Sequence, residues 1–215
     1  MSSWGIGITF LLTIAVLAIP LVGKFFKVLN TMLHESGHAL MSLLFSGRVV
    51  SISLFTNTAG VAVTQSQSWI GRVFVSIAGY PFSSCIAYLL FTWYLHGKWQ
   101  WVLYLFIGFC VVNLLLWVRN LYGVIWLIGF LSVLSLFLFV DFTWKSYGIL
   151  FLIFIVYAES VTTSWTILRL SFRTPKEAGD ASNLARATKI PSIVWGTFFF
   201  LQSLYFVTLG VRALL

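Results

Sequence analysis

The chain has 215 residues, of which 60% are hydrophobic and only 8% are charged, and its formal net charge is +8. This composition excludes a water-soluble domain and indicates an integral membrane protein. The positive charge does not indicate nucleic-acid binding, because the basic residues stand singly at the ends of apolar segments, where such residues set orientation and contact anionic lipid.

Seven membrane spans are expected, because about 20 apolar residues cross a bilayer as a helix. The chain divides into spans at residues 4–22, 25–46, 69–95, 101–118, 123–140, 147–168 and 193–213. The first span has no basic residues before it and no small-residue cleavage site, which favours a retained transmembrane helix over a signal peptide. The expected fold class is therefore an all-α polytopic membrane protein, with a single transmembrane domain over residues 1–215.

The second span contains the most informative motif of the chain, His34-Glu35-Ser36-Gly37-His38. Residues four apart share one face of a helix, about 6 Å from each other, so two imidazoles in this pattern can bind one zinc ion. Glu35 between them can act on a water molecule beside the metal. Ionisable side chains are costly inside a membrane, and the chain has only three His and three Glu. The motif indicates a zinc site, and the alternative is a polar cluster between helices.

A β-hairpin is expected directly after the second span. Within residues 48–68, apolar and polar side chains alternate along two short runs, 50–54 and 61–64, with Asn57 and Gly60 between them. Alternation of this kind around turn residues is typical of a hairpin. Beside a membrane active site, a hairpin can hold an extended substrate by adding a strand to its edge, or it can simply cap the helical bundle.

The connection over residues 169–192 also differs from a simple loop. It is rich in basic residues, and residues 181–189 are expected to form a short helix. Gly179 and Asp180 precede this segment and Pro191 follows it, which matches the usual start and stop signals of a helix.

Lysine and arginine counts predict the orientation. Eight of these residues lie on the side of the hairpin and the 169–192 connection, and five lie on the other side. The positive-inside rule therefore predicts a multi-pass protein of the cell membrane with a cytoplasmic amino terminus and a cytoplasmic 169–192 loop. His38 then lies about 12 Å from the cytoplasmic end of its helix.

A catalytic zinc usually has three protein ligands, and the chain offers few candidates for the third. Glu159 lies in the sixth span at a depth similar to the histidines, and a buried carboxylate needs a partner. Asp180 is on the same side in a loop, where it can alternatively cap the short helix that follows it. Chemistry alone slightly favours Glu159.

Several motifs along the chain resemble the site-2 protease family of intramembrane zinc metalloproteases, in particular a compact branch without soluble domains. These motifs are His34-Glu35-Ser36-Gly37-His38-Ala39-Leu40, Gly47-Arg48, the hairpin with Gly60, Ala78-Gly79-Tyr80-Pro81, Arg119-Asn120-Leu121-Tyr122-Gly123, Asp180-Ala181, Leu184-Ala185, Thr188, Ile190-Pro191 and Trp195. The resemblance implies zinc bound by His34 and His38, with Glu35 as the catalytic residue. It also implies that the hairpin corresponds to the membrane-reentrant hairpin of the family.

The sequence departs from the larger family at one motif. Members of that family carry Asn-x-x-Pro-x-x-x-Leu-Asp-Gly, whose aspartate is the third zinc ligand, whereas the corresponding residues 113–123 contain no aspartate here. The compact branch keeps an Asp-Ala pair at the position of Asp180, so the resemblance favours Asp180 over Glu159 as the third ligand. Asn120 is a further candidate, although a neutral amide is a weaker zinc ligand than a carboxylate.

The resemblance thus implies an intramembrane zinc metalloendopeptidase with Zn²⁺ as cofactor, which cleaves transmembrane segments of membrane proteins within the lipid bilayer. Glu35 would act as the general base. Asn113, or Arg119 together with Asn120, is a candidate for stabilising the developing oxyanion, although Arg119 can equally anchor the chain at the membrane interface.

Two other functions compete with proteolysis. One is a non-proteolytic membrane scaffold or regulatory protein, which the missing aspartate motif favours and the retained Glu35 opposes. The other is a metal or proton transporter that uses Glu159 and the histidines along a path.

Overall fold

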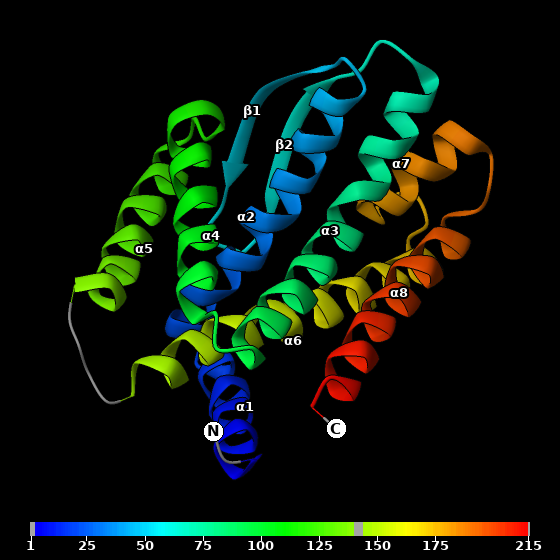
Figure 1. The fold of residues 1–215 in the computed structure, drawn as a ribbon. Helices are drawn as coiled ribbons and strands as arrows, with labels where there is room; N and C mark the ends of the chain where they lie inside the picture. Colours follow the sequence, from blue (N-terminus) through cyan, green and yellow to red (C-terminus); the bar gives the residue numbers. More distant parts are fainter. Residues whose placement is uncertain (1–2, 140–143, 215) are drawn as a thin grey trace.

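The computed structural model describes residues 3–139 and 144–214, and within these ranges the chain is mostly helical (Figure 1). The last residue of the predicted span 123–140 lies outside the described residues. The elements are α1 (Ser3–Ala18), α2 (Pro20–Leu44), β1 (Arg48–Leu54), β2 (Gly60–Gln65), α3 (Trp69–Leu95), α4 (Trp99–Val112), the π-helix η1 (Asn113–Trp117), α5 (Leu121–Phe139), α6 (Lys145–Arg173), α7 (Gly179–Thr188) and α8 (Ser192–Arg212).

Five helical segments of the described residues are long and apolar enough to cross a membrane. They are α3, α4 together with η1, α5, α6 and α8. Helices α1 and α2 pass the same test only as a pair, and the chain bends by 111° between them. The polytopic helical fold is therefore confirmed, whereas the expected number of about seven spans becomes five, or six if the bent pair is one span.

The bend between α1 and α2 has a local cause. Pro20 begins α2, a position that tolerates its missing N–H. The chain then folds back so closely that a Cβ at Gly23 would overlap the Leu17 carbonyl. Only glycine fits at this approach, so the predicted spans 4–22 and 25–46 become two helices that meet at a corner.

The expected hairpin is present as an antiparallel pair of strands, β1 and β2, in which Ile52 lies opposite Ala62. The outer edge of β1 is covered by the segment after η1. Ile52 forms a parallel bridge with Val118. The Asn120 amide accepts from the Leu54 N–H at 3.1 Å and donates to the Leu54 carbonyl at 2.6 Å. One edge of the hairpin is therefore fastened to the helical bundle.

Replacing Asn120 with alanine is expected to destabilise the protein by about 1–3 kcal/mol, because the buried backbone of Leu54 loses both partners. Thermal unfolding in detergent measures the change. Asn57→Ala is the matched control, since that exposed amide only accepts from the Ala59 N–H within the turn. A change of less than about 0.5 kcal/mol is expected there. Equal stability of the two variants would contradict the anchoring role of Asn120.

Helix α2 lies between the hairpin and α3 (Figure 1). It approaches α3 closely because Gly37 has no side chain at the contact. A Cβ at Gly37 would lie 2.7 Å from the Phe82 Cβ and 3.2 Å from the Ala78 carbonyl oxygen. Small residues allow such close helix contact in membranes. This contact fixes the height and rotation of the His-Glu-x-x-His face relative to α3.

Candidate metal centre

His34 and His38 lie one turn apart on α2, and their Nε2 atoms are 3.0 Å from each other. Their rings meet edge to face, with centroids 4.7 Å apart. Both side chains are mostly buried, with 14% and 9% of their surfaces exposed. The helical spacing in the sequence therefore does place two imidazole nitrogens at one point.

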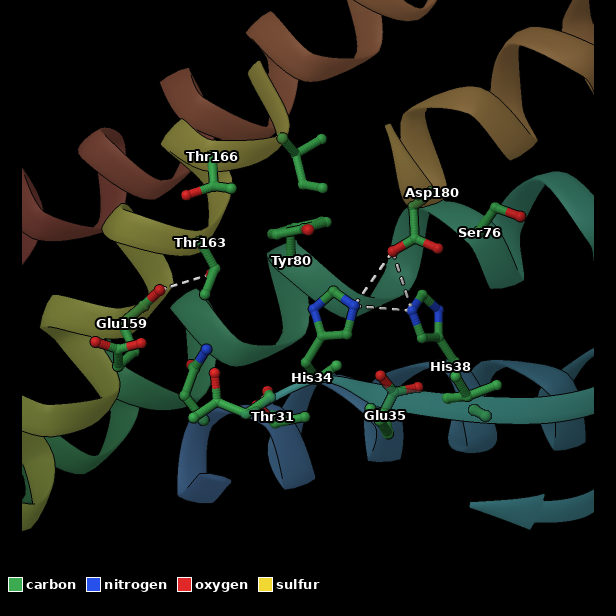
Figure 2. A pocket seen from close by; sticks show the side chains of 18 of the residues that line it. Thr31, His34, Glu35, His38, Ser76, Tyr80, Glu159, Thr163, Thr166 and Asp180 are labelled. Atoms are coloured by element: carbon green, nitrogen blue, oxygen red, sulfur yellow. Dashed lines mark hydrogen bonds and ion pairs between the residues drawn. The ribbon is translucent and has the colours of Figure 1, made fainter. Parts of the chain in front are cut away.

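Asp180 reaches the same point from α7, which lies in the connection between α6 and α8. Its Oδ2 is 3.2 Å from both histidine Nε2 atoms (Figure 2). The short helix predicted at residues 181–189 is present as Gly179–Thr188. Its N-cap residue is Ala178, so Asp180 does not cap the helix and its carboxylate faces the histidines instead.

A small apolar cluster holds α7 in this position. It is separate from the main core and joins α3, α7 and α8 through Tyr80, Ala178, Ala181, Leu184 and Phe199. The Tyr80 ring also packs edge to face on His34, with centroids 4.5 Å apart. Packing therefore carries a loop helix over the His-Glu-x-x-His face.

The three atoms fit a zinc shell. Zinc bonds of about 2.0–2.2 Å place tetrahedral ligands roughly 3.3–3.6 Å apart, and the three separations here are 3.0, 3.2 and 3.2 Å. Two imidazoles and one carboxylate are a known set for catalytic zinc, which leaves one position for water or substrate. Among the described residues, His34, His38 and Asp180 form the one group of three or more such side chains that can hold a metal ion.

The surroundings of the histidines orient them for this role. His38 Nδ1 lies 2.6 Å from the Val75 carbonyl oxygen and donates to it, so Nε2 is the nitrogen that faces Asp180 and can bind a metal ion once it gives up its proton. A Cβ at Gly79 would lie 2.5 Å from His34 Nε2 and 2.6 Å from His38 Nε2. The backbone of α3 can therefore close one side of the site only because residue 79 is glycine.

The electrostatic surroundings of Asp180 favour its role as a metal ligand. Burial alone would raise the pKa of its carboxyl group, but the charges and hydrogen bonds of His38 and His34 outweigh burial and hold the pKa well below its ordinary value. Asp180 is therefore ionised over the physiological pH range, as a zinc ligand must be.

Glu35 lies beside the three ligands and against the hairpin (Figure 2). It is 6% exposed, and a Cβ at Gly60 would lie 2.7 Å from its Oε1 atom. Glycine at residue 60 therefore leaves the space that the carboxylate occupies. The Glu35 carboxylate accepts a hydrogen bond from the backbone N–H of Ala62 on β2, which holds it beside the histidines.

The inner edge of the hairpin borders the site. Because Ile52 and Leu54 point their backbone groups toward residues 118–120, their partners Ala62 and Gly60 point theirs away from β1. Within the described residues, no backbone hydrogen bond from another element reaches this edge of β2. A strand edge without a paired strand thus lies next to Glu35, and its Ala62 N–H donates to the Glu35 carboxylate.

The three metal ligands, Glu35 and the edge of β2 line one cavity of about 790 Å³. Its walls include the two histidines, Glu35 and Asp180, the β2 edge, and part of α6. The cavity is large enough for a short stretch of extended polypeptide.

The three residues considered for oxyanion stabilisation are not among those that line this cavity. Asn113 is buried and donates to Ser36 Oγ at 2.8 Å. Arg119 donates to the Val118 carbonyl and to carbonyls of η1. Asn120 holds β1, as described above. All three side chains therefore make hydrogen bonds that support the fold. Asn120, which was also a candidate third ligand, does not lie near His34, His38 and Asp180.

Glu159, the alternative third ligand, lines the cavity but lies away from the three ligands (Figure 2). Its Oε1 is 3.4 Å from Lys27 Nζ. The structure brings Asp180, and not Glu159, to the histidines. Sequence reasoning missed the role of Gly79, although a glycine inside an apolar helix is a signal of close backbone approach.

Comparison with known proteins agrees with this geometry. No curated protein and no solved structure matches the chain. A family model described as Peptidase M50B-like matches residues 7–210, which is nearly the whole chain. Peptidases of this family depend on zinc, the ion that the donor set fits. The chain therefore belongs to the Peptidase M50B-like family, a site-2 protease family, which indicates a metallopeptidase of the membrane.

Proposed function

We propose that this protein is an intramembrane zinc metalloendopeptidase that cleaves transmembrane segments of other membrane proteins. The observation that carries the proposal is the convergence of His34, His38 and Asp180 at 3.0–3.2 Å in a cavity that also contains Glu35. Metal binding alone does not require a carboxylate at residue 35, whereas hydrolysis requires a general base there.

The chemistry divides between the metal and Glu35. Zinc, when bound by His34, His38 and Asp180, supplies a Lewis acid that polarises a carbonyl group and lowers the pKa of water to about 7. Glu35 takes the proton of the attacking water and delivers it to the departing amine nitrogen. The low exposure of Glu35 keeps bulk water away from this transfer.

The open edge of β2 supplies the substrate-holding surface. A transmembrane helix hides its carbonyl groups in internal hydrogen bonds, so a substrate must unwind locally before attack. An extended segment can recover part of these hydrogen bonds by pairing with Gly60 and with the Ala62 carbonyl as an added strand, while the Ala62 N–H holds the Glu35 carboxylate. The scissile bond is then held beside Glu35.

We extend the proposal to topology. The count of eight basic residues against five favours a cytoplasmic position for the hairpin and the 169–192 connection in the cell membrane. A cytoplasmic amino terminus requires α1 and α2 to cross the membrane twice or to re-enter it, and the terminus lies on the other side if the bent pair is one span. Residues 1–215 act as a single membrane domain in this arrangement.

Zinc analysis of the purified protein tests the metal, and the substitution Glu35→Gln tests the reaction. We expect about one zinc per chain in both proteins, because Glu35 is not a ligand. Cells that express the variant should accumulate uncut membrane proteins, since loss of a general base slows a reaction by roughly 10²–10⁴-fold. Quantitative proteomics of the membrane fraction measures this accumulation.

Two outcomes would contradict the proposal. Purified wild-type protein without zinc would contradict the proposed metalloprotease activity. Identical membrane proteomes from wild-type and Glu35→Gln cells would indicate a non-proteolytic scaffold.

A further inference from the structure

The cavity continues beyond the metal ligands to a second polar group that the proposed reaction does not use. Lys27 and Asn30 from α2 and Glu159 from α6 line this end of the cavity. We call these three residues the distal polar site. Figure 2 shows Glu159 at the opposite side of the view from Asp180.

The distal polar site is costly for a membrane protein to keep. Lys27 and Glu159 form an ion pair at 3.4 Å in which the Glu159 side chain is only 8% exposed. Asn30 is 2% exposed, and its Oδ1 has no hydrogen-bond partner among the described residues. A buried acceptor without a donor costs about 1–3 kcal/mol. Charged and polar groups in such positions mark functional sites.

The spacing relates the distal polar site to the scissile bond. Lys27, Asn30 and His34 share one face of α2, since they are separated by three and four residues. Asn30 lies about 6 Å and Lys27 about 10 Å before His34 along the helix axis. An extended strand advances about 3.3 Å per residue. A substrate strand along β2 therefore reaches Asn30 after about two residues and the ion pair after about three.

The chemistry of the distal polar site selects one class of side chain. Lys27 and Glu159 neutralise each other, so a third charge would be left unpaired in the membrane. A carboxamide carries two N–H donors and a carbonyl acceptor. It can donate to Asn30 Oδ1 and to the Glu159 carboxylate, and it can accept from Lys27. An aliphatic side chain would leave all three groups without these bonds.

We propose that the distal polar site is a specificity subsite that binds an asparagine or glutamine side chain of the substrate, two or three residues from the bond that is cut. This proposal rests on the proposed protease function. It names the substrate class as transmembrane segments that carry a carboxamide close to the scissile bond.

The test uses synthetic transmembrane peptides of leucine and alanine, in which a single asparagine is moved through the central positions. Binding to the Glu35→Gln protein in detergent is measured by fluorescence, so no cleavage interferes. We expect one or two asparagine positions to bind roughly threefold to twentyfold more tightly than the parent peptide, the range of a hydrogen bond between membrane helices.

The same peptides are then measured with variants of the distal polar site. The double variant Lys27→Met with Glu159→Leu replaces an ion pair by apolar groups without leaving a lone charge, and Asn30→Leu removes the amide. Both are expected to keep zinc and lose the asparagine preference. Ser76→Ala, which changes a cavity residue on α3, is the matched control and should retain it.

Each result bears on one proposal alone. Equal binding of all peptides to the Glu35→Gln protein, or an asparagine preference that survives in the double variant, would overturn the subsite. Failure of wild-type protein to cut any peptide, despite a position-dependent preference that the double variant abolishes, would overturn the protease function and leave the subsite supported. When cutting occurs, mass spectrometry should locate the cut bond two or three residues from the preferred asparagine.

Discussion

Asp180→Ala protein is expected to bind zinc more than about 100-fold more weakly than the wild type. Loss of groups that only support zinc ligands already costs about 10–100-fold, and Asp180 offers its own oxygen at 3.2 Å from both histidines. Competition with a chelator of known affinity, followed by metal analysis, measures the change. Peptide cleavage is expected to disappear together with the zinc.

Two acidic residues provide controls for this prediction. Glu177 lies exposed in the same connection as Asp180, and Glu159 lies in the same cavity and pairs with Lys27. Glu177→Gln and Glu159→Gln are both expected to keep full zinc affinity. Zinc loss in Glu159→Gln together with full occupancy in Asp180→Ala would reverse the assignment of the third ligand.

Gly79→Ala is expected to lower zinc affinity by roughly 10–100-fold without removing a ligand. The added methyl group would lie 2.5–2.6 Å from both Nε2 atoms, well inside ordinary contact distance. The histidines cannot both retreat, because His38 is held by the Val75 carbonyl and the Tyr80 ring packs on His34. The same zinc competition experiment measures the effect.

Gly108→Ala on α4 is the matched control for Gly79→Ala. A Cβ at Gly108 meets no atom within 4 Å, so the substitution only replaces glycine by a better helix former. Its zinc affinity is expected to equal that of the wild type. Unchanged affinity in Gly79→Ala would show that the helices can separate at this contact, contrary to the close packing described above.

The sequence was sufficient for the parts of the fold that depend on local pattern. Apolar length located the five long spans, and alternation with turn residues located the hairpin. The corner between α1 and α2 was not predictable in this way, because both segments are apolar and the break depends on the approach of Gly23 to Leu17. Hydropathy measures length and composition, and it does not report the angle between consecutive helices.

The site residues that lie close together in the sequence were predictable, and the distant one was not. His34, Glu35 and His38 lie within one helical turn and a half, so their spacing alone indicated a common face. Asp180 is 146 residues from His34, and chemistry alone slightly favoured Glu159. The position of Asp180 depends on the packing of α7 on α3 and α8, which no local pattern encodes.

Lys27 illustrates the same limit. A lysine near the start of an apolar segment reads as an interfacial anchor, and a carboxylate inside another segment reads as a group in need of a partner. Only the crossing of α2 and α6 shows that Lys27 and Glu159 meet. Asn113, Arg119 and Asn120 were considered for the reaction because they are polar, yet their contacts are with Ser36, η1 and β1.

The metal ligands come from two very different elements, a long core helix and the ten-residue α7 outside the spans. Metal affinity and the docking of α7 are for this reason linked quantities. A partner that binds α7 only when α7 is docked increases the affinity for zinc by some factor. Zinc then increases the affinity for that partner by the same factor. Conversely, a chelator should raise the rate at which proteases cut the 174–191 connection. Accessibility of that connection thus provides a readout of metal occupancy in intact membranes.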